Sequence, residues 1–434
     1  VLFRSLVISG GRVMDPESAL DSVRNIDLHA HGQTNQSNEY QAHDGVTTAL
    51  ELEVGVPAVG AFLKNRAGRA ILNYGATASH GAMRAMSFRE FAAEAASWNN
   101  STQRWSEISQ KARYKSLTDP EEFTTLAATM ERGLIEGALG LGVAHQYYPG
   151  ATREEIFRVF QMAQRWKVPI FTHVRSMTVD AMQEMISNAA ATGASLHIVH
   201  VNSMSRSSIP LVLEMIDSAR KRGLDITTEA YPYTAASTGI QSTIFDDGWQ
   251  ERLGISYGDV QWVATGERLT KETFEAYRKQ GGYVIMHFMK PEWIDQAMAS
   301  PFVMVASDGM PYAPGAHPRS AGTFSRLLGY YVRERQVLPL MQALAKITLM
   351  PARRLEPIAP RMKNKGRLRV GADADITVFD PDRVRDTATF EKGLSFSAGI
   401  DHVVVNGIPV VQDGKTVPNR SEERRVGKEC RSRW

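Results

Sequence analysis

The chain has 434 residues, of which 43% are hydrophobic and 22% are charged, and its formal net charge is +3. This balance excludes an intrinsically disordered chain, and no apolar run approaches the roughly 20 residues that span a bilayer. The single cysteine, Cys430, excludes an internal disulfide and a thiolate metal cage. Since no apolar secretory segment follows a charged start, we predict a cytoplasmic protein.

The two ends of the chain differ in character from the rest. Residues 420–434 hold six basic residues against three glutamates, an excess that equals the whole net charge. This segment has no amphipathic period, so we interpret it as a non-native tail, and residues 1–5 resemble it. The remaining chain is electrically balanced, which excludes a basic nucleic-acid surface. We expect a small-molecule substrate, no nucleic-acid or membrane partner, and barrel helices compatible with a homo-oligomer.

Strand patterns recur along the chain, mostly separated by helical patterns. Residues 6–13 predict a short hairpin strand with a Gly-Gly turn, before the series begins. The eight predicted strands of the series are residues 25–32, 45–53, 70–75, 137–143, 168–173, 195–200, 225–231 and 302–308. Helices are predicted over 87–116, from 119, from 152, and over 178–191, 208–222 and 335–356. Eight such units predict a parallel sheet closed into a (β/α)8 TIM-like barrel, an α/β fold.

Two stretches do not fit the repeating unit. Residues 235–285, rich in Gly, Asp and Trp, are too long for a plain crossover, and we predict that they form a lid. Beyond residue 356 the pattern returns to short strands with turn residues. We therefore predict a barrel over 25–356 and a small β-sandwich domain built from both chain ends, residues 6–24 and 357–419.

Side chains that bind metals collect at the predicted strand ends, where (β/α)8 barrels place their reactive groups. His29 and His31 lie two apart on one strand, so they point to the same side, as do Glu51 and Glu53. His173, His200 and Asp308 end three further strands. An isolated pair of this kind is equally explained by hydrogen-bonded surface histidines, and His197, on the opposite face from His200, is interpreted as structural. Together, imidazoles and carboxylates without thiolate predict zinc or a similar divalent ion.

Motifs that span nearly the whole chain carry a family resemblance. They are DLHAHG (27–32), DGVTT (44–48), GALGLG (137–142), THVR (172–175), YPYTAAST (231–238), ASDG (306–309), HPRSAGTFSRLLGYYVRE (317–334) and GADADITVFDP (371–381). In these motifs the chain resembles the metal-dependent amidohydrolase superfamily, close to its N-acyl-D-amino-acid deacylase (D-aminoacylase-like) branch. The resemblance implies a metal-bearing barrel that hydrolyses amide bonds other than ordinary peptide bonds.

The resemblance also implies roles for residues of this chain. It implies metal ligation by His29, His31, His173, His200 and Asp308, with Asp308 also handling protons as the catalytic residue. Arg319 lies where relatives of this branch bind a substrate carboxylate, and Tyr231, Tyr233 and His80 are expected to add hydrogen bonds to the substrate.

The chain departs from the branch at three places. Val54 stands where the branch has a metal-binding cysteine, and residues 137–146 contain no lysine to be carboxylated. We therefore expect Glu53 as the bridging ligand, with Glu51 as the second choice. Asn202 replaces a lysine of the branch. The run from Asp15 to the histidine strand is short, so the N-terminal part of the small domain is expected to be truncated.

These observations predict a hydrolase with one or two Zn²⁺ ions that deacylates N-acyl-D-amino acids by attack of metal-activated hydroxide. The first alternative is a cyclic-amide hydrolase of the dihydroorotase or hydantoinase type. The second is a non-catalytic or truncated barrel that binds metal without turnover.

Overall fold

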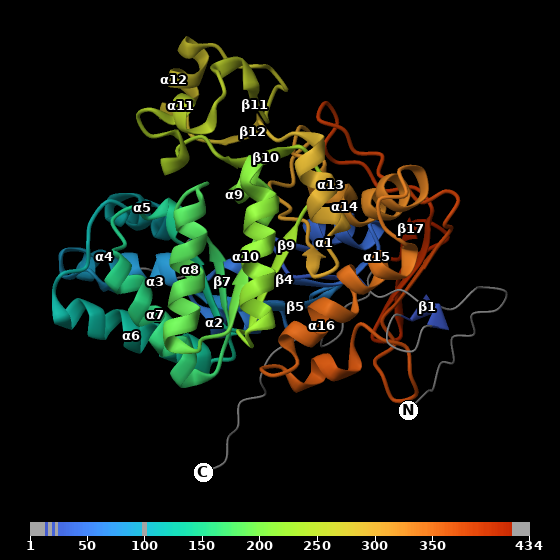
Figure 1. Ribbon diagram of the computed structural model, residues 1–434, viewed down its shortest axis with the longest axis horizontal. Helices are drawn as coiled ribbons and strands as arrows, with labels where there is room; N and C mark the ends of the chain where they lie inside the picture. Colours follow the sequence, from blue (N-terminus) through green and yellow to red (C-terminus); the bar gives the residue numbers. More distant parts are fainter. Residues whose placement is uncertain (1–13, 16–19, 22–24, 98–101, 419–434) are drawn as a thin grey trace.

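The structure, a computed structural model, describes residues 14–15, 20–21, 25–97 and 102–418 and consists of a central barrel with two attached β units (Figure 1). Eight parallel strands follow one another in the order β13-β9-β8-β7-β6-β5-β4-β3. Their bounds are β3 Asn25–Asp27, β4 Val46–Val56, β5 Asn73–Ser79, β6 Leu141–Ala144, β7 Ile170–His173, β8 Leu196–Ile198, β9 Ile226–Ala230 and β13 Val303–Val305. The predicted eight-stranded α/β barrel is confirmed.

The barrel closes just beyond the strand ends rather than along them. Asp308 N donates to the carbonyl of His29 at 2.7 Å, and His31 N donates to that of Gly309 at 3.2 Å. A parallel bridge joins Ala30 to Gly309. This closure places the first and last strands side by side at the end of the barrel that carries the histidines.

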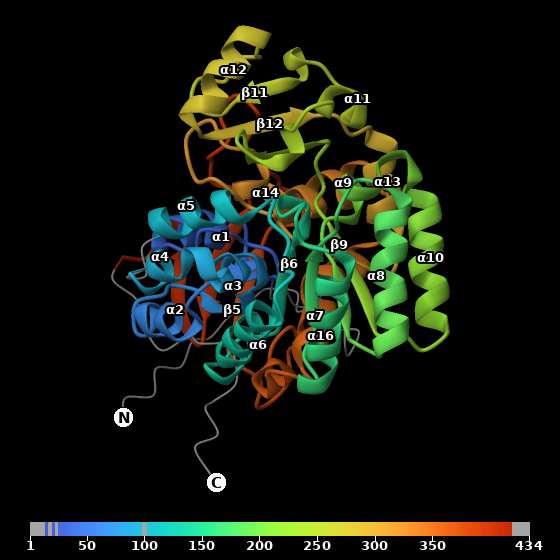
Figure 2. The ribbon, with the colours of Figure 1, turned by 90° about the vertical axis from the view of Figure 1, so that its left-hand side faces the viewer.

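Helices surround the barrel and bury one large apolar core between themselves and the strands. Apolar residues of the helices pack inward because their spacing follows the 3.6-residue period. The helices are α1 Asn35–His43, α2 Val59–Arg66, α3 His80–Ser87, α4 Ala92–Ala96, α5 Thr102–Ala112, α6 Pro120–Ile135, α7 Arg153–Trp166, α8 Val179–Thr192, α9 Val201–Ser205, α10 Ile209–Lys221, α13 Pro291–Ala299, α14 Arg319–Arg326, α15 Leu340–Ile347 and α16 Leu349–Leu355. Figure 2 shows α7, α8 and α10 standing along the outside of the strands.

The third strand of the series differs from the prediction. It was expected over 70–75, but β5 runs from Asn73 to Ser79. Its second half consists of small residues, of which Thr77 favours strands and the alanines do not. The strand continues there because Ala76 and Ala78 pair with β4 and Ala78 also pairs with β6, and small side chains let these strands approach.

The stretch predicted as a lid is a folded insertion. It contains β10 Ala235–Gly239, α11 Trp249–Leu253, β11 Val260–Trp262, α12 Lys271–Gln280 and β12 Tyr283–His287. The three strands form an antiparallel sheet with β12 in the middle, and an apolar cluster around Phe245, Trp249 and Phe274 is separate from the barrel core. The insertion lies as a distinct lobe above the barrel in Figures 1 and 2.

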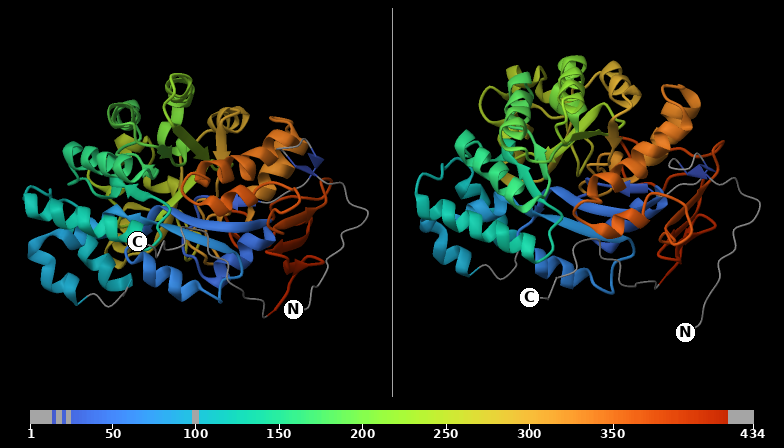
Figure 3. Two further views of the ribbon diagram at one scale, coloured as in Figure 1. Left: turned by 90° about the horizontal axis from the view of Figure 1, so that it is seen from below. Right: turned by 60° about the horizontal axis from the view of Figure 1, so that its bottom comes forward.

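A second β unit follows the barrel. Its antiparallel sheet, in the order β14-β15-β16-β17, consists of Ile376–Phe379, Ile400–Val405, Ile408–Gln412 and Lys415–Thr416 and lies at the edge of the molecule in Figure 3. Among the described residues, β1 Met14–Asp15 and β2 Leu20–Asp21 pair with each other and not with this sheet. The predicted strand at 6–13 and the tail at 420–434 lie outside the described residues. The division into domains stays a prediction.

In the described part of the chain, every helix is too short or too polar to cross a bilayer.

Candidate metal centre

The two histidines that follow the first strand, β3, meet at the mouth of the barrel, and each uses its two ring nitrogens differently. The Nε2 atoms of His29 and His31 lie 3.1 Å apart. The other ring nitrogen of His29, Nδ1, lies 2.6 Å from Glu229 Oε1, and that of His31 lies 2.9 Å from Glu51 Oε1. A proton on each Nδ1 that is donated to its carboxylate leaves both Nε2 lone pairs converging on one point. This arrangement suits a cation between them.

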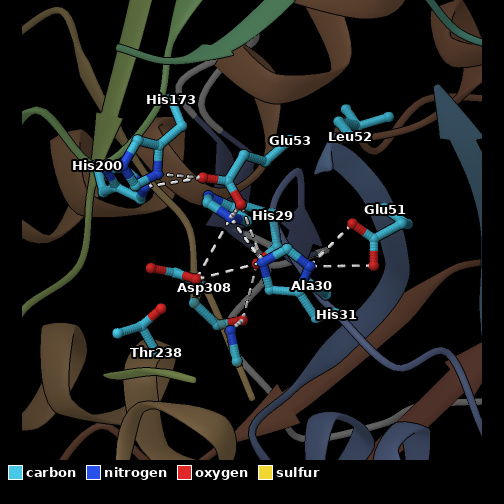
Figure 4. Close-up of polar contacts among 12 residues, drawn as sticks. His29, Ala30, His31, Glu51, Leu52, Glu53, His173, His200, Thr238 and Asp308 are labelled. Atoms are coloured by element: carbon cyan, nitrogen blue, oxygen red, sulfur yellow. Dashed lines mark hydrogen bonds and ion pairs between the residues drawn. The ribbon is translucent and has the colours of Figure 1, made fainter. Parts of the chain in front are cut away.

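Glu53 lies at the centre of the cluster and faces two sets of histidines (Figure 4). Its Oε2 is 3.2 Å from the Nε2 atoms of both His29 and His31. Its Oε1 is 2.7 Å from His173 Nδ1 and 3.1 Å from His200 Nε2. One carboxylate therefore joins two groups of nitrogen donors, as a bridging ligand does.

Asp308 completes the first group. Its Oδ1 is 3.4 Å from the Nε2 atoms of His29 and His31, and its Oδ2 is 2.8 Å from Arg319 Nη1. The structure thus forms two sets of buried donors, His29, His31, Glu53 and Asp308 in one, and Glu53, His173 and His200 in the other. The atoms within each set lie within 4.8 Å of one another, and imidazole with carboxylate is the donor chemistry of zinc.

The cluster attracts positive charge. Burial lowers the pKa of His29, but the carboxylates of Asp308, Glu53 and Glu229 outweigh burial and hold that pKa well above 6.5. Burial likewise raises the pKa of Glu53, yet its histidine neighbours bring it well below 4.5. Glu53 and Asp308 are therefore ionised although they are buried. A divalent ion supplies the positive charge that they require.

The local backbone brings these side chains to the centre. His200 and Asp308, which lie shortly after the ends of β8 and β13, both adopt left-handed φ angles, +34° and +50°. Such conformations cost about 1–3 kcal/mol each and concentrate at functional sites. Gly142 of the GALGLG motif lies against β4, where a Cβ atom would come 2.6 Å from the carbonyl of Glu53. Glycine at this position lets β6 approach the strand that carries Glu53.

A cavity of about 660 Å³ opens above the cluster. Glu53, His173, His200 and Asp308 are among the residues on its inner surface, together with Tyr231. Much of the remaining surface is apolar and comes from the barrel and the insertion, from residues Val54, Val56, Pro57, Met177, Met204, Ala236, Ile244 and Met286. The cavity therefore places a small molecule against the clustered donors.

Of the four residues predicted to contact substrate, only Tyr231 lines this cavity. Arg319 is 1% exposed, and its guanidinium lies against Asp308 and over the Tyr231 ring at 4.6 Å. Tyr233 donates to Asp386 at 3.2 Å, and His80 lies 2.8 Å from Glu155 in a buried cluster. These three side chains do not line the cavity in this structure, and their contact with substrate stays a prediction.

The sequence analysis missed Glu229 and Gln146. Glu229 lies near the end of β9, and its two oxygens contact His29 Nδ1 and, at 3.0 Å, His197 Nε2. His197 therefore contacts a carboxylate that supports His29 and does not itself face the cluster. Gln146 Oε1 lies 2.5 Å from His173 Nε2. Glu229 was detectable as a carboxylate near the end of a predicted strand, whereas nothing in the local pattern pointed to Gln146.

A family model described as the amidohydrolase family matches residues 66–411. The chain belongs to the amidohydrolase family. Membership confirms the predicted resemblance and agrees with the barrel and its clustered donors.

Several curated amidohydrolases resemble the chain over part of their length. It is 31% identical over 318 residues to D-aminoacylase of Alcaligenes xylosoxydans xylosoxydans, a match that covers 69% of this chain and 63% of the relative. It is 32% identical over 305 residues to N-acyl-D-glutamate deacylase of the same organism, with 65% and 60% covered. It is 27% identical over 250 residues to allantoinase of Deinococcus radiodurans, with 55% and 48% covered. The chain thus spans less than two thirds of these relatives.

Solved structures share the fold. A D-aminoacylase structure, 23% identical, superposes with a TM-score of 0.75 over 94% of this chain and 89% of the other. N-acyl-D-glutamate deacylase from Bordetella bronchiseptica, complexed with zinc and a phosphonate inhibitor, is 24% identical with a TM-score of 0.75 over 94% and 88%. A D-hydantoinase structure is 14% identical with a TM-score of 0.55 over 93% and 86%.

Proposed function

We propose that this amidohydrolase is a metal-dependent hydrolase of non-peptide amide C–N bonds and that it deacylates N-acyl-D-amino acids. The observation that carries the proposal is the sharing of Glu53 between two pairs of histidines, beside Asp308, on the inner surface of one cavity. The similarity to D-aminoacylase and N-acyl-D-glutamate deacylase supports this substrate class. A cytoplasmic location and the oligomeric state stay predictions.

We propose zinc as the metal, held by His29, His31, Asp308 and Glu53 in one position and by Glu53, His173 and His200 in the other. A zinc ion in these positions would lower the pKa of a water molecule and polarise an amide carbonyl. In this proposal Glu53 fills the bridging role that a cysteine has in the D-aminoacylase-like branch, although the position of that cysteine corresponds to Val54. The two oxygens of Glu53 face opposite donor groups, so the neighbouring Val54 is not needed for ligation.

In this proposal Asp308 handles the proton. Its Oδ1 faces the histidines while Oδ2 is held by Arg319 at 2.8 Å, so the carboxylate is fixed in orientation. Burial raises its pKa, but Arg319 and His29 lower it below the ordinary 3.8, so Asp308 is ionised and able to accept a proton. It takes the proton from the attacking water and returns it to the leaving nitrogen. Arg319 therefore acts through Asp308.

The test of the proposed function is Asp308→Asn. We expect turnover of N-acyl-D-amino acids to fall by at least about 10²-fold. The amide oxygen of asparagine can still coordinate the metal, but the neutral amide does not act as a base. Zinc content, measured by elemental analysis of the same protein, should stay close to that of the wild type. Turnover that survives the substitution would refute the proton role of Asp308.

Cyclic-amide hydrolysis is the second candidate, because allantoinase, a dihydroorotase and hydantoinases also resemble the chain. A panel of N-acyl-D-amino acids against hydantoin, allantoin and dihydroorotate separates the two. Bound zinc without turnover of either class would favour a barrel that binds metal without catalysis.

A further inference from the structure

The two histidines of the second donor set, His173 and His200, differ in how their rings are held. His173 Nδ1 lies 2.7 Å from Glu53 Oε1, and its Nε2 lies 2.5 Å from Gln146 Oε1. His200 faces Glu53 with its Nε2 at 3.1 Å, and among the described residues its buried Nδ1 has no hydrogen-bond partner. The contact with Gln146 is therefore the hydrogen bond from outside the cluster that orients this pair of histidines.

The amide oxygen of Gln146 determines which nitrogen of His173 carries a proton. An amide oxygen only accepts hydrogen bonds, so the Nε2 atom of His173 has to be the donor. A neutral imidazole with its proton on Nε2 has a lone pair on Nδ1, and Nδ1 is the atom that faces the carboxylate of Glu53. Both groups then offer lone pairs to the space between them. This is the arrangement that a bound cation completes.

Gln146 is held in place by both the barrel and the insertion. It lies two residues beyond Ala144, the end of β6, which pairs in register with His173 at the end of β7. The backbone carbonyl of Gln146 accepts a hydrogen bond from Thr243 Oγ1 of the insertion at 2.8 Å. The ring of Tyr147, the next residue, lies 4.8 Å from the His173 ring. These contacts keep the amide beside Nε2, and they involve neither Glu53 nor a metal ion.

We propose that Gln146 is a positioning residue for the second metal position, where it keeps the proton of His173 on Nε2. The Nδ1 lone pair of His173 is thereby directed toward the zinc ion that this donor set would hold with Glu53 and His200. Outer partners of this kind fix the tautomer and the ring orientation of a histidine that binds a metal. The proposal rests on the zinc centre of the proposed function and is independent of the substrate.

The experiment measures zinc dissociation constants by competition with a chelator, and His173→Ala identifies the binding step of the second donor set. Gln146→Leu, which accepts no hydrogen bond, should raise the dissociation constant of that step about 10- to 100-fold and leave any other step unchanged. Gln146→Glu should bind zinc at least as tightly as the wild type, because a carboxylate also accepts the Nε2 proton. Gln164→Leu, at an exposed position of α7, is the matched control and should change neither step.

Unchanged dissociation constants in Gln146→Leu would overturn the proposal. An equal loss in Gln146→Glu would overturn it as well, because the packing of the side chain rather than an accepted proton would then matter. Zinc binding by the wild type that is absent, or insensitive to His173→Ala, would refute the second metal position and this role with it. Zinc binding that depends on Gln146 without turnover of N-acyl-D-amino acids would support the proposal and refute only the proposed deacylation.

Discussion

At the scale of single residues, the carboxylates of the candidate metal centre lie in two kinds of position. Glu53 faces both sets of histidines, whereas Glu51 and Glu229 each bond the outer nitrogen of one histidine. Such partners fix the ring orientation and raise the basicity of the inner nitrogen. Glu51, the second choice as bridging ligand, thus has the geometry of an orienting residue.

Glu229→Gln tests this arrangement. A neutral amide still bonds His29 but no longer raises its basicity, so we expect zinc affinity to fall about 10- to 100-fold. Competition titrations against a chelator measure the dissociation constant. Glu214→Gln, an exposed residue of α10, provides the matched control and should bind zinc like the wild type. Unchanged affinity in Glu229→Gln would contradict the orienting role.

At the scale of elements, a buried ion cluster joins helices that are distant in sequence. Glu155, fully buried on α7, accepts from Arg84 Nε of α3 at 2.7 Å and lies 2.8 Å from His80 Nε2. Arg84 also donates to the carbonyl of Ala112, at the end of α5. The N-cap residue Thr152 bonds the backbone N–H of Glu155, so the helix start and the cluster share one residue.

Glu155→Gln should be strongly destabilising although it lies outside the cavity. Removal of the carboxylate leaves Arg84 buried without a counter-charge, which costs about 3–5 kcal/mol of unfolding free energy. Urea denaturation measures this loss. Glu154→Gln next to it removes only an exposed pair with Arg158 and should change stability by less than about 1 kcal/mol. Equal stability of the two variants would show that the cluster is not needed to hold the helices.

At the scale of the whole molecule, one buried carboxylate joins three parts of the chain. Asp44 follows α1 and accepts from the backbone N–H groups of Phe324 and Ser325 at 2.8 Å each and from Ser397 Oγ at 3.0 Å. Burial outweighs these hydrogen bonds and raises its pKa to about 6 from the ordinary 3.8. The N-terminal part of the barrel, α14 and the C-terminal region are thereby coupled to protonation.

The pH dependence of stability should reveal Asp44. Between pH 3.8 and about 6 the folded protein keeps a proton that the unfolded chain has lost, so this group lowers the unfolding free energy as pH rises. The loss amounts to about 3 kcal/mol at about 1.36 kcal/mol per pKa unit. Urea denaturation of wild type and Asp44→Asn should give a stability difference that changes by this amount over that interval and is constant above it. A difference independent of pH would contradict the prediction.

The barrel and most of the residues of the candidate metal centre were predictable from local sequence patterns. Strand alternation predicts which side chains share a face, and parallel strands of a barrel bring their carboxyl ends together. His29, His31, His173, His200 and Asp308 therefore converge as expected, with Glu53 in reach of all of them. The composition excluded a cage of thiolate ligands, because the chain has a single cysteine.

The partners of these residues were not predictable from the sequence, because they come from distant segments that the fold brings together. Glu229 lies 200 positions from His29, and the pairing of Arg319 with Asp308 likewise joins distant segments. The same holds for His80, which faces Glu155 rather than the cavity, and for the insertion, whose apolar residues form a core of their own. Periodicity encodes the face on which a side chain lies. Its partner depends on contacts between distant segments, which no local pattern contains.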